Sequence, residues 1–277
     1  MKLLLSKPRG FCAGVERAIE TVEKALDLYG APIYVKHEIV HNKHVVNGLK
    51  EKGVVFVEDL SDVPVGERII YSAHGVSPSV RELAKQRNLI EIDATCGLVT
   101  KVHSAVKRFA HRGYKIVLIG HKNHVEIIGT AGEAPDVTTI VESVEDVMAL
   151  SYLPEEKLFY ATQTTLSLDD VKEIAEALTV KYPHIESIPS SSICYATTNR
   201  QMALRQIVEN VDLILVVGDP QSSNSNRLRE VGELRGIPSY LINEKSDINP
   251  DWFKGVQLIG LTAGASTPET VVQDCIN

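Results

Sequence analysis

The sequence predicts an α/β protein made of three similar small parallel-sheet units, arranged with pseudo-threefold symmetry around a central cluster. Two observations carry this prediction. A strand that runs into a capped acidic turn recurs three times, ending at residues 63, 147 and 248, which lie 84 and 101 residues apart. Three of the four cysteines, Cys12, Cys96 and Cys194, lie 84 and 98 residues apart. Positions that recur together at such intervals are typical of an internal repeat.

The elements of one repeat follow the same order in each third of the chain. A short apolar strand is predicted before each cysteine, at Lys2–Leu5, Leu89–Ile92 and Ile185–Ile188. After each cysteine, apolar residues recur at helical spacing. A strand then runs into a polar loop, at Val35–Asn42, Ile119–His124 and Val217–Asn224. The strand with the acidic turn follows, and a last strand ends in small polar residues before another helix. Strands that alternate with helices indicate a parallel sheet covered by helices.

The same repeat sets the expected boundaries of the units. We expect a first unit at residues 13–95, a second at 96–193 and a third at 194–277, the last completed by the N-terminal strand of residues 1–12. In such sheets, ligands bind beyond the carboxyl ends of the strands. The cysteines and the polar loops fall at those ends, so three units that face one another would bring three thiols and six loops to one centre.

Composition and charge exclude several classes of protein. The net charge is −7, and lysines and arginines are scattered, which argues against a nucleic-acid partner held through phosphates. No apolar run approaches the roughly 18–20 residues of a membrane span, and the N-terminus lacks the apolar stretch of a secretory signal. We therefore expect a cytoplasmic protein, where disulfides are rare. The four cysteines are then buried thiols, metal ligands or catalytic groups.

The cysteine spacing favours an iron–sulfur cluster. Three distant cysteines do not match the paired spacing of structural zinc sites or the four-cysteine runs of ferredoxins. At one centre they would leave one iron of a 4Fe–4S cluster without a protein ligand, and an open iron can act as a Lewis acid on a substrate oxygen. The sequence thus predicts an enzyme with one 4Fe–4S cluster per chain and with Cys12, Cys96 and Cys194 as metal ligands. The plainer alternative is three core thiols. Cys275 falls on no repeat position, and we assign it no role.

Polar residues on the loops suit an anionic substrate. His41, His74 and His124 fall on repeat positions, and three histidines on converging loops favour anion binding over separate structural roles. The run Ser222–Asn226 offers neutral donors between a strand and a helix, which is either a turn or a phosphate-binding arrangement. Glu126 lies two residues after His124, where it could deliver a proton near an iron-bound oxygen. The absence of GxxxxGKS and GxGxxG motifs argues against a nucleotide substrate.

These residues lie in motifs that resemble one family, 4-hydroxy-3-methylbut-2-enyl diphosphate reductase, the last enzyme of the non-mevalonate isoprenoid route. The matching stretches are Gly10–Val15, Val40–Asn42, Ser72–Ser77, Asp93–Cys96, Thr162–Thr165, Ile193–Arg200, Ser222–Arg227 and Thr262–Ser266. They span nearly the whole chain in order. The chain differs from the usual family pattern at Gly97, Val125 and Asp219.

The resemblance implies a three-lobed fold around a 4Fe–4S cluster and a reductive dehydration that yields isopentenyl and dimethylallyl diphosphates, with a ferredoxin or flavodoxin as electron donor. It implies that Glu126 supplies protons and that Thr164 contacts the substrate hydroxyl, which makes Glu126, His124 and Thr164 the catalytic residues. The implied ligands of the diphosphate are His41, His74, His124, Ser222, Ser223, Asn224 and Ser266.

Two alternatives from other classes stay open at this point. A redox-neutral iron–sulfur dehydratase would use an open iron on a hydroxy acid and would need guanidinium groups for the carboxylates. The polar loops hold serines, asparagines and histidines instead. A non-catalytic cluster sensor would need an exposed basic or apolar partner face, which the sequence does not indicate.

Overall fold

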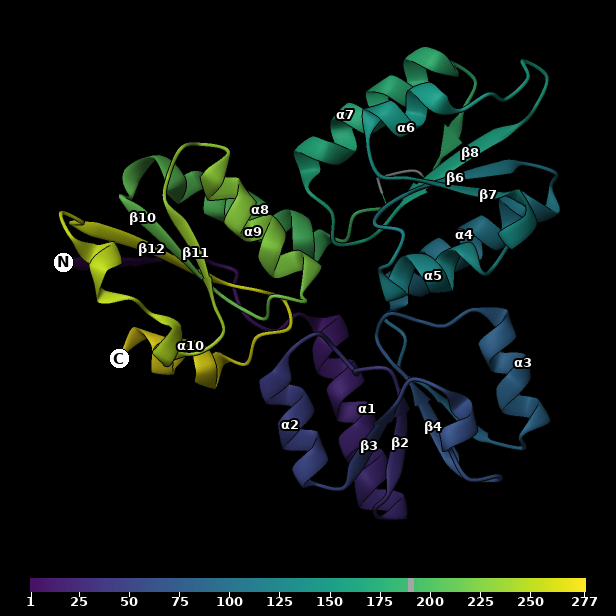
Figure 1. The fold of residues 1–277 in the computed structure, drawn as a ribbon, viewed down its shortest axis with the longest axis horizontal. Helices are drawn as coiled ribbons and strands as arrows, with labels where there is room; N and C mark the ends of the chain where they lie inside the picture. Colours follow the sequence, from purple (N-terminus) through teal and green to yellow (C-terminus); the bar gives the residue numbers. More distant parts are fainter. Residues whose placement is uncertain (189–191) are drawn as a thin grey trace. The chain divides into compact units, whose positions relative to one another are not determined.

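The structure is a computed structural model that describes residues 1–188 and 192–277. The chain divides into two compact units, one made of residues 1–16, 40–48 and 195–277 and the other of residues 17–39 and 49–194. Three four-stranded sheets, in which every pair of neighbouring strands is parallel, form the framework (Figure 1). The second unit contains two of the sheets and the first unit contains the third.

The first sheet along the chain has the order β3-β2-β4-β5. Its strands are β2 (Ile33–Lys36), β3 (Val54–Val57), β4 (Arg68–Tyr71) and β5 (Ile90–Asp93). The helices in this stretch are α1 (Ala13–Tyr29), α2 (Lys43–Glu51) and α3 (Pro78–Gln86). On one face, Ile69 and Tyr71 are fully buried in a cluster with Ala84 of α3, so β4 forms the centre of this core.

The second sheet has the order β7-β6-β8-β9. Its strands are β6 (Lys115–Ile119), β7 (Thr138–Val141), β8 (Leu158–Thr162) and β9 (Glu186–Ser187). Its helices are α4 (Gly97–His111), α5 (Val125–Ala131), α6 (Val144–Ala149) and α7 (Leu168–Lys181). Ile116 and Leu118 pack in one cluster with α4, and Val117 and Ile119 pack in another with α7. Alternate residues of β6 are therefore buried on both faces, which explains its unbroken apolar run.

The third sheet has the order β1-β12-β10-β11. Its strands are β1 (Lys2–Leu5), β10 (Leu213–Val217), β11 (Ser239–Ile242) and β12 (Leu258–Ala263), and its helices are α8 (Tyr195–Ile207), α9 (Ser223–Glu233) and α10 (Glu269–Ile276). The N-terminal strand β1 pairs in parallel with β12, so that Lys2 lies beside Leu258. Cys275 is 9% exposed in the apolar cluster between this sheet and α10. Its role is thus one of packing.

All three sheets share one order when they are written from the strand that precedes a cysteine. The strand before the cysteine (β5, β9 or β1) pairs with the last strand of the repeat (β4, β8 or β12). The last strand pairs with the first strand of the repeat (β2, β6 or β10), which in turn pairs with the strand before the acidic turn (β3, β7 or β11). The turns are also alike, because a side chain caps each of them: Asp59 accepts from Ser61 N, Ser143 accepts from Asp146 N, and Asp247 accepts from Glu244 N. The predicted α/β fold of three similar parallel-sheet units is confirmed.

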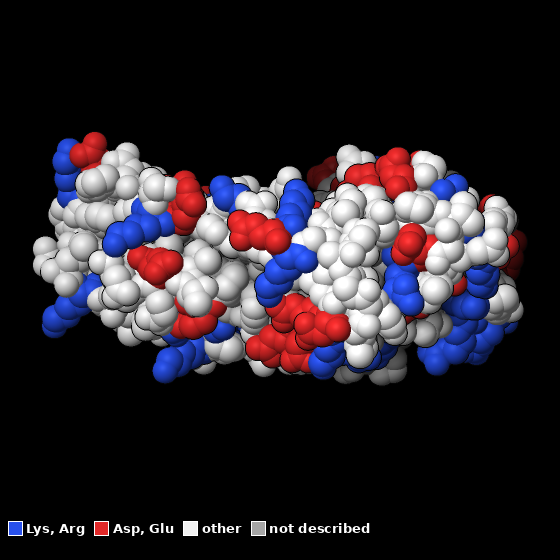
Figure 2. All heavy atoms as spheres, turned by 90° about the horizontal axis from the view of Figure 1, so that it is seen from below, with Lys and Arg blue, Asp and Glu red and all other residues white. Residues whose placement is uncertain are grey.

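One predicted strand is shorter than expected. The segment predicted as Ile185–Ile188 pairs only through Glu186 and Ser187. Ile188 lies just outside the strand, is 6% exposed and belongs to the apolar cluster that contains Phe109 and Phe159. None of the helices in the described part of the chain has the length and apolar composition that a membrane span requires. On the face drawn in Figure 2, acidic and basic side chains are interspersed.

Candidate functional site

The three repeat cysteines are held by the same backbone contact. Each cysteine donates its backbone N–H to the carbonyl two residues beyond the end of the last strand of a repeat, which is β4, β8 or β12. The three bonds are Cys12 to Ala265 at 3.2 Å, Cys96 to Ala73 at 3.0 Å, and Cys194 to Thr164 at 3.0 Å. Each cysteine also directly precedes a helix, α1, α4 or α8. One local geometry is therefore built three times around a thiol.

The three thiols suit a cluster by their chemistry. Cys12, Cys96 and Cys194 are in no disulfide and are half-buried, and thiolates at helix N-termini are good ligands for iron. Cys12 lies in one compact unit, and Cys96 and Cys194 lie in the other. Within residues 1–188 and 192–277, no group of three or more His, Cys, Asp or Glu side chains is placed to hold a metal ion. The joint ligation of a cluster by the three thiols thus stays a prediction. Each cysteine lies directly before a helix, a position that favours the thiolate.

In the second unit, two predicted histidines face each other. The ring centroids of His74 and His124 lie 5.9 Å apart with an interplanar angle of 83°. His74 follows strand β4 and is 3.2 Å from the Ser72 hydroxyl through Nδ1. His124 is the N-cap of α5, and its Nδ1 accepts the backbone N–H of Glu126 at 3.2 Å. These contacts turn both imidazoles toward the same space at the carboxyl ends of β4 and β6.

Glu126 and Thr164 form a buried pair in the same unit. Glu126 is 3% exposed and Thr164 is 5% exposed. The Thr164 backbone N–H donates to Oε1 of Glu126 at 2.6 Å, and the Thr164 hydroxyl lies 2.9 Å from Oε2. Two bonds of this kind fix both oxygens of the carboxyl group. The structure therefore brings together four of the predicted residues of this unit, His74, His124, Glu126 and Thr164.

The first unit holds the other predicted ligands of the diphosphate. The Ser266 hydroxyl donates to the His41 carbonyl at 2.9 Å and lies 3.5 Å from the Ser222 hydroxyl. Ser222 is the N-cap of α9, where its side chain accepts the N–H of Ser225. Asn224 accepts the N–H of Ala265 at 2.9 Å, and Ser223 is the first residue of the helix. His41, Ser222, Asn224 and Ser266 are thus linked around the start of α9.

Two residues near the predicted site had no role assigned from the sequence. Gln163 is 1% exposed, and its Oε1 accepts the N–H of His121 at 3.1 Å, which ties the end of β8 to the loop that carries His124. Its position at a strand end within the Thr162–Thr165 motif was the available signal. His37 lies with its ring centroid 6.0 Å from that of His74 and with Nδ1 2.7 Å from Glu58.

The positions at which the chain departs from the usual family pattern each have a structural role. Gly97 begins α4, and Val125 begins α5 directly after its N-cap His124. Asp219 accepts the backbone N–H of Lys43 at 3.0 Å and that of Gln221 at 2.9 Å. Its carboxylate is therefore occupied in joining the loop after β10 to the start of α2.

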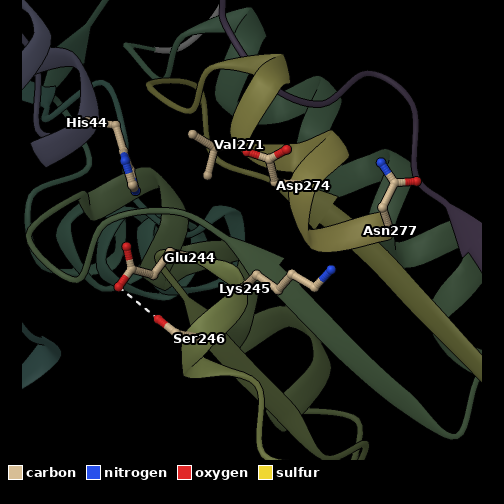
Figure 3. A pocket seen from close by; sticks show the side chains of 7 residues that line it. All are labelled: His44, Glu244, Lys245, Ser246, Val271, Asp274 and Asn277. Atoms are coloured by element: carbon tan, nitrogen blue, oxygen red, sulfur yellow. Dashed lines mark hydrogen bonds between the residues drawn. The ribbon is translucent and has the colours of Figure 1, made fainter.

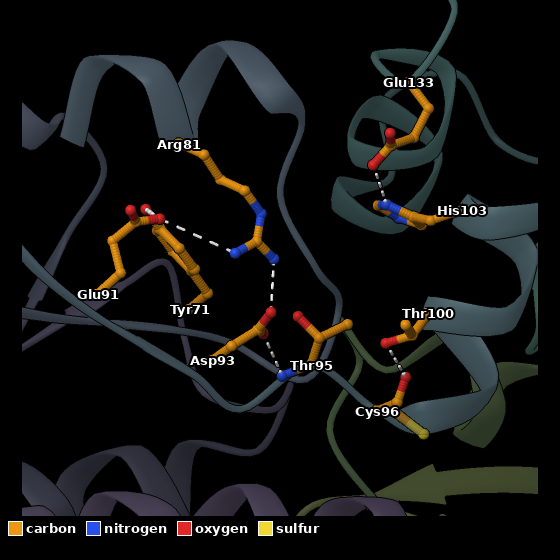
Figure 4. Close-up of polar contacts among 9 residues, drawn as sticks. All are labelled: Tyr71, Arg81, Glu91, Asp93, Thr95, Cys96, Thr100, His103 and Glu133. Atoms are coloured by element: carbon orange, nitrogen blue, oxygen red, sulfur yellow. Dashed lines mark hydrogen bonds and ion pairs between the residues drawn. The ribbon is translucent and has the colours of Figure 1, made fainter. Parts of the chain in front are cut away.

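A network of charged side chains holds the segment in front of Cys96 (Figure 4). Asp93 accepts from the Arg81 guanidinium at 2.6 Å and from the Thr95 N–H at 2.9 Å. Arg81 also lies over the ring of Tyr71, whose hydroxyl donates to Glu91 at 2.8 Å. Burial and the bond to Glu91 raise the pKa of Tyr71. The end of β5, from which the chain proceeds to Cys96, is thereby fixed to β4 and α3.

This network predicts a pH-dependent contribution to stability. Burial raises the pKa of Asp93, but the hydrogen bonds from Thr95 and Arg81 outweigh it and leave the pKa below its ordinary value. A lowered carboxyl pKa stabilises the fold above the unfolded pKa of about 3.9, and the contribution is lost as the pH falls through the folded value. Because the side chain is 45% exposed, we expect Asp93→Asn to cost at most about 1 kcal/mol at pH 7.

Urea unfolding of the wild type and of Asp93→Asn at several pH values measures this effect. The difference in urea midpoint between the two proteins should have its full size at pH 7 and should vanish as the pH falls below about 3.9. Asp136→Asn, at an exposed position, serves as the control. A gap that stays constant down to pH 3 would contradict the assignment to the ionised carboxylate.

A separate pocket of about 440 Å³ lies in the first unit beside α10 (Figure 3). Its lining residues are His44, Glu244, Lys245, Ser246, Val271, Asp274 and Asn277. His44 is bonded to the Asn243 carbonyl at 3.0 Å, and Glu244 accepts from Ser246 at 2.8 Å. None of the predicted site residues lines this pocket, so it does not belong to the predicted site.

Comparisons with known proteins agree along the whole chain. The 4-hydroxy-3-methylbut-2-enyl diphosphate reductase of Protochlamydia amoebophila (strain UWE25) is 77% identical over 276 residues, which are 100% of this chain and 88% of that protein. The enzyme of the same name from Chlamydia pneumoniae is 64% identical and covers 99% of this chain and 89% of its own length.

Two solved structures have the same fold. The E-1-hydroxy-2-methyl-but-2-enyl-4-diphosphate reductase from Plasmodium falciparum matches with a TM-score of 0.99 at 55% identity, over 100% of this chain and 87% of that one. A structure of (E)-4-hydroxy-3-methyl-but-2-enyl diphosphate reductase matches with a TM-score of 0.70 at 32% identity, over 100% and 98%. The sequence model of the LytB protein family matches residues 3–277. This chain therefore belongs to the LytB protein family.

Proposed function

We propose that this chain catalyses the reductive dehydration of 4-hydroxy-3-methylbut-2-enyl diphosphate. Two electrons and two protons enter, the C–O bond of the allylic alcohol breaks, and water leaves with formation of isopentenyl or dimethylallyl diphosphate. The enzyme is thus an oxidoreductase of isoprenoid biosynthesis. The observation that carries the proposal is the threefold repetition of one cysteine geometry. Each cysteine donates its backbone N–H to a carbonyl just beyond the last strand of a repeat, and each directly precedes a helix.

Cys12, Cys96 and Cys194 would hold one 4Fe–4S cluster per chain. None of the three thiols is in a disulfide, and a set of three thiolates would leave one iron open to substrate. When bound, the cluster supplies the electrons and a Lewis-acid iron that weakens the C–O bond of the substrate. The chain itself supplies the binding, orientation and protons that the reaction needs.

The diphosphate would be held by neutral donors and imidazoles. In the second unit, His74 and His124 present their rings to each other at 5.9 Å. In the first unit, His41, Ser223, Asn224 and Ser266 join Ser222 at the N-terminus of α9, an 11-residue helix. The N–H groups and the dipole of a helix N-terminus favour a phosphate group. Binding of the diphosphate would fix the position of the reacting carbon and hydroxyl.

Glu126 would hold the proton and Thr164 would pass it on. A protonated Oε2 donates to the Thr164 hydroxyl 2.9 Å away, and that hydroxyl can at the same time donate to the substrate oxygen. The Thr164 N–H on Oε1 keeps the carboxyl group aligned throughout. Because Glu126 is buried, it is shielded from bulk water during the transfer.

The geometry argues against the redox-neutral dehydratase. That enzyme would need a guanidinium group to hold a substrate carboxylate. Arg200 follows Cys194 and is 4% exposed, yet its guanidinium donates to the carbonyls of Ala196, Gly10 and Phe11. It therefore holds the backbone in front of Cys12 and is committed to the structure.

The proposal extends to the setting of the enzyme. The electrons would come from a ferredoxin or flavodoxin, and the reaction would take place in the cytoplasm. We also propose that the three α/β units are residues 13–95, 96–193 and 194–277, the last with residues 1–12, because each of these stretches contributes one equivalent sheet order.

An anaerobic assay tests the proposal. The chain is purified without oxygen, its iron and sulfide are restored, and a chemically reduced viologen dye supplies electrons to 4-hydroxy-3-methylbut-2-enyl diphosphate. Mass spectrometry should detect isopentenyl and dimethylallyl diphosphates. A protein that contains about four irons per chain but yields neither product would overturn the proposed reaction.

A further inference from the structure

A buried histidine outside the predicted site lies behind the turn that carries His74. His103 is in the second turn of α4 and is 8% exposed. Its Nδ1 lies 2.9 Å from Oε1 of Glu133, and the two side chains are 10% and 13% exposed (Figure 4). Burial of both partners makes this bond a firm restraint on the plane of the imidazole. The predicted chemistry does not use either residue.

The edge of the ring opposite this bond packs against the backbone of the His74 turn. Gly75 has a φ of +76°, and a Cβ added there would lie 3.2 Å from both Cε1 and Nε2 of His103. Nε2 is buried and has no hydrogen-bond partner among the described residues, so packing alone fixes this edge of the ring. Only glycine allows the imidazole to approach the turn so closely.

Helix α5, which begins directly after His124, meets the same turn. A Cβ added at Gly129 of α5 would lie 3.3 Å from the Gly75 carbonyl oxygen and 3.5 Å from Cε1 of His103. One turn later, a Cβ at Gly132 would lie 2.4 Å from Cβ of Ser77. The ring of His103 therefore lies where a side chain would otherwise stand at two positions, Gly75 on the turn that carries His74 and Gly129 on the helix that His124 caps.

We infer that His103 is a positioning residue for the substrate diphosphate. Its imidazole, oriented by Glu133, sets how closely the Gly75 turn approaches α5, and thereby sets the 5.9 Å separation of the His74 and His124 rings. His103 acts through these two histidines and does not touch the substrate. The inference rests on the proposed function, in which both histidines bind the diphosphate.

Two substitutions separate the parts of this arrangement. His103→Asn keeps an amide nitrogen near the position of Nδ1 for Glu133 but removes the ring edge that touches Gly75. His103→Phe keeps a ring of similar size but removes the bond. His111→Asn, at an exposed position in the last turn of the same helix, is the matched control. The readout is calorimetric binding of inorganic diphosphate to the cluster-loaded protein, together with the thermal unfolding midpoint of each sample.

We expect His103→Asn to weaken diphosphate binding about tenfold. This is the size of effect expected when a displaced His74 loses one hydrogen bond to the charged diphosphate. His103→Phe should weaken it less than threefold, and His111→Asn should leave it unchanged. The decisive measurement repeats His103→Asn in a His74→Ala background, where the loss should fall below twofold because the turn that His103 positions no longer carries an imidazole. A tenfold loss in both backgrounds, or no loss in the wild-type background, would overturn the inference.

Gly129→Ala tests the same contact without altering His103. The added methyl group should push the Gly75 turn by a few tenths of an ångström and weaken binding in the wild type but not in His74→Ala. This variant decides the question if His103→Asn does not fold. If His74→Ala by itself leaves diphosphate binding unchanged, the proposed substrate site is wrong and the inference fails with it. If His74→Ala weakens binding but the effect of His103→Asn is the same in both backgrounds, only the inference fails.

Discussion

Replacing Glu126 with glutamine should lower the rate of product formation by about two to four orders of magnitude, the range for a lost general acid. Glutamine keeps the size of the side chain, and its amide oxygen can still accept the Thr164 N–H that now bonds to Oε1. The amide nitrogen cannot supply the proton that the reaction requires. The expected defect therefore lies in turnover, measured as kcat in the anaerobic assay, with little change in KM.

The iron content distinguishes this chemical defect from a structural one. Glu126→Gln should retain the iron and sulfide of the wild type, since the substitution leaves all three repeat cysteines in place. Glu176→Gln, on the exposed face of α7, is the control and should keep full activity. Wild-type turnover in Glu126→Gln would remove the carboxyl group from the mechanism.

Replacing Cys12 with serine should abolish activity and strip most of the iron from the protein. A serine hydroxyl is a poor ligand for iron at neutral pH, and two remaining thiolates cannot retain an open 4Fe–4S cluster. The anaerobically reconstituted wild type should be brown, with a broad absorbance band near about 400 nm and about four irons per chain. Cys12→Ser should lose this band, and Cys96→Ser and Cys194→Ser should behave in the same way.

Cys275→Ser supplies the matched control for the loss of a thiol. Burial raises the pKa of this cysteine to about 11, and its side chain packs in the cluster beneath α10. We expect this variant to keep the iron and the absorbance band, with at most a modest loss of stability. A cluster that survives in Cys12→Ser, or one that disappears in Cys275→Ser, would contradict the assignment of the ligands.

The repeating fold could be predicted because its signals are local and periodic. The acidic turns at Asp59, Ser143 and Glu244 place a polar cap at the same point of each repeat, and the helix that follows each cysteine has apolar residues at regular spacing. Strand ends were less predictable, as β9 illustrates. There, the apolar residues Ile185 and Ile188 lie outside the strand, which pairs only through Glu186 and Ser187.

The candidate site residues could be proposed from their residue types, but the contacts that support them could not be predicted. Cysteines and histidines at repeat positions point to a cluster and an anion because few other residues have that chemistry. The contacts that orient them leave no such trace in the sequence. Gln163 contacts the loop of His124 across 42 residues of sequence, and His103 lies against Gly75, 28 residues away, so both contacts are tertiary.

The pairing of β1 with β12 has a consequence for the order of events during synthesis. Residue 2 cannot find its partner until residue 258 has been made, so the first strand waits for most of the chain. At about 5–20 residues per second this wait lasts on the order of 10–50 seconds. Cys12, whose N–H donates to the Ala265 carbonyl, lacks this anchor throughout. Insertion of the proposed iron–sulfur cluster would therefore follow translation, and the first of the three repeat cysteines to be made is the last to gain its backbone anchor.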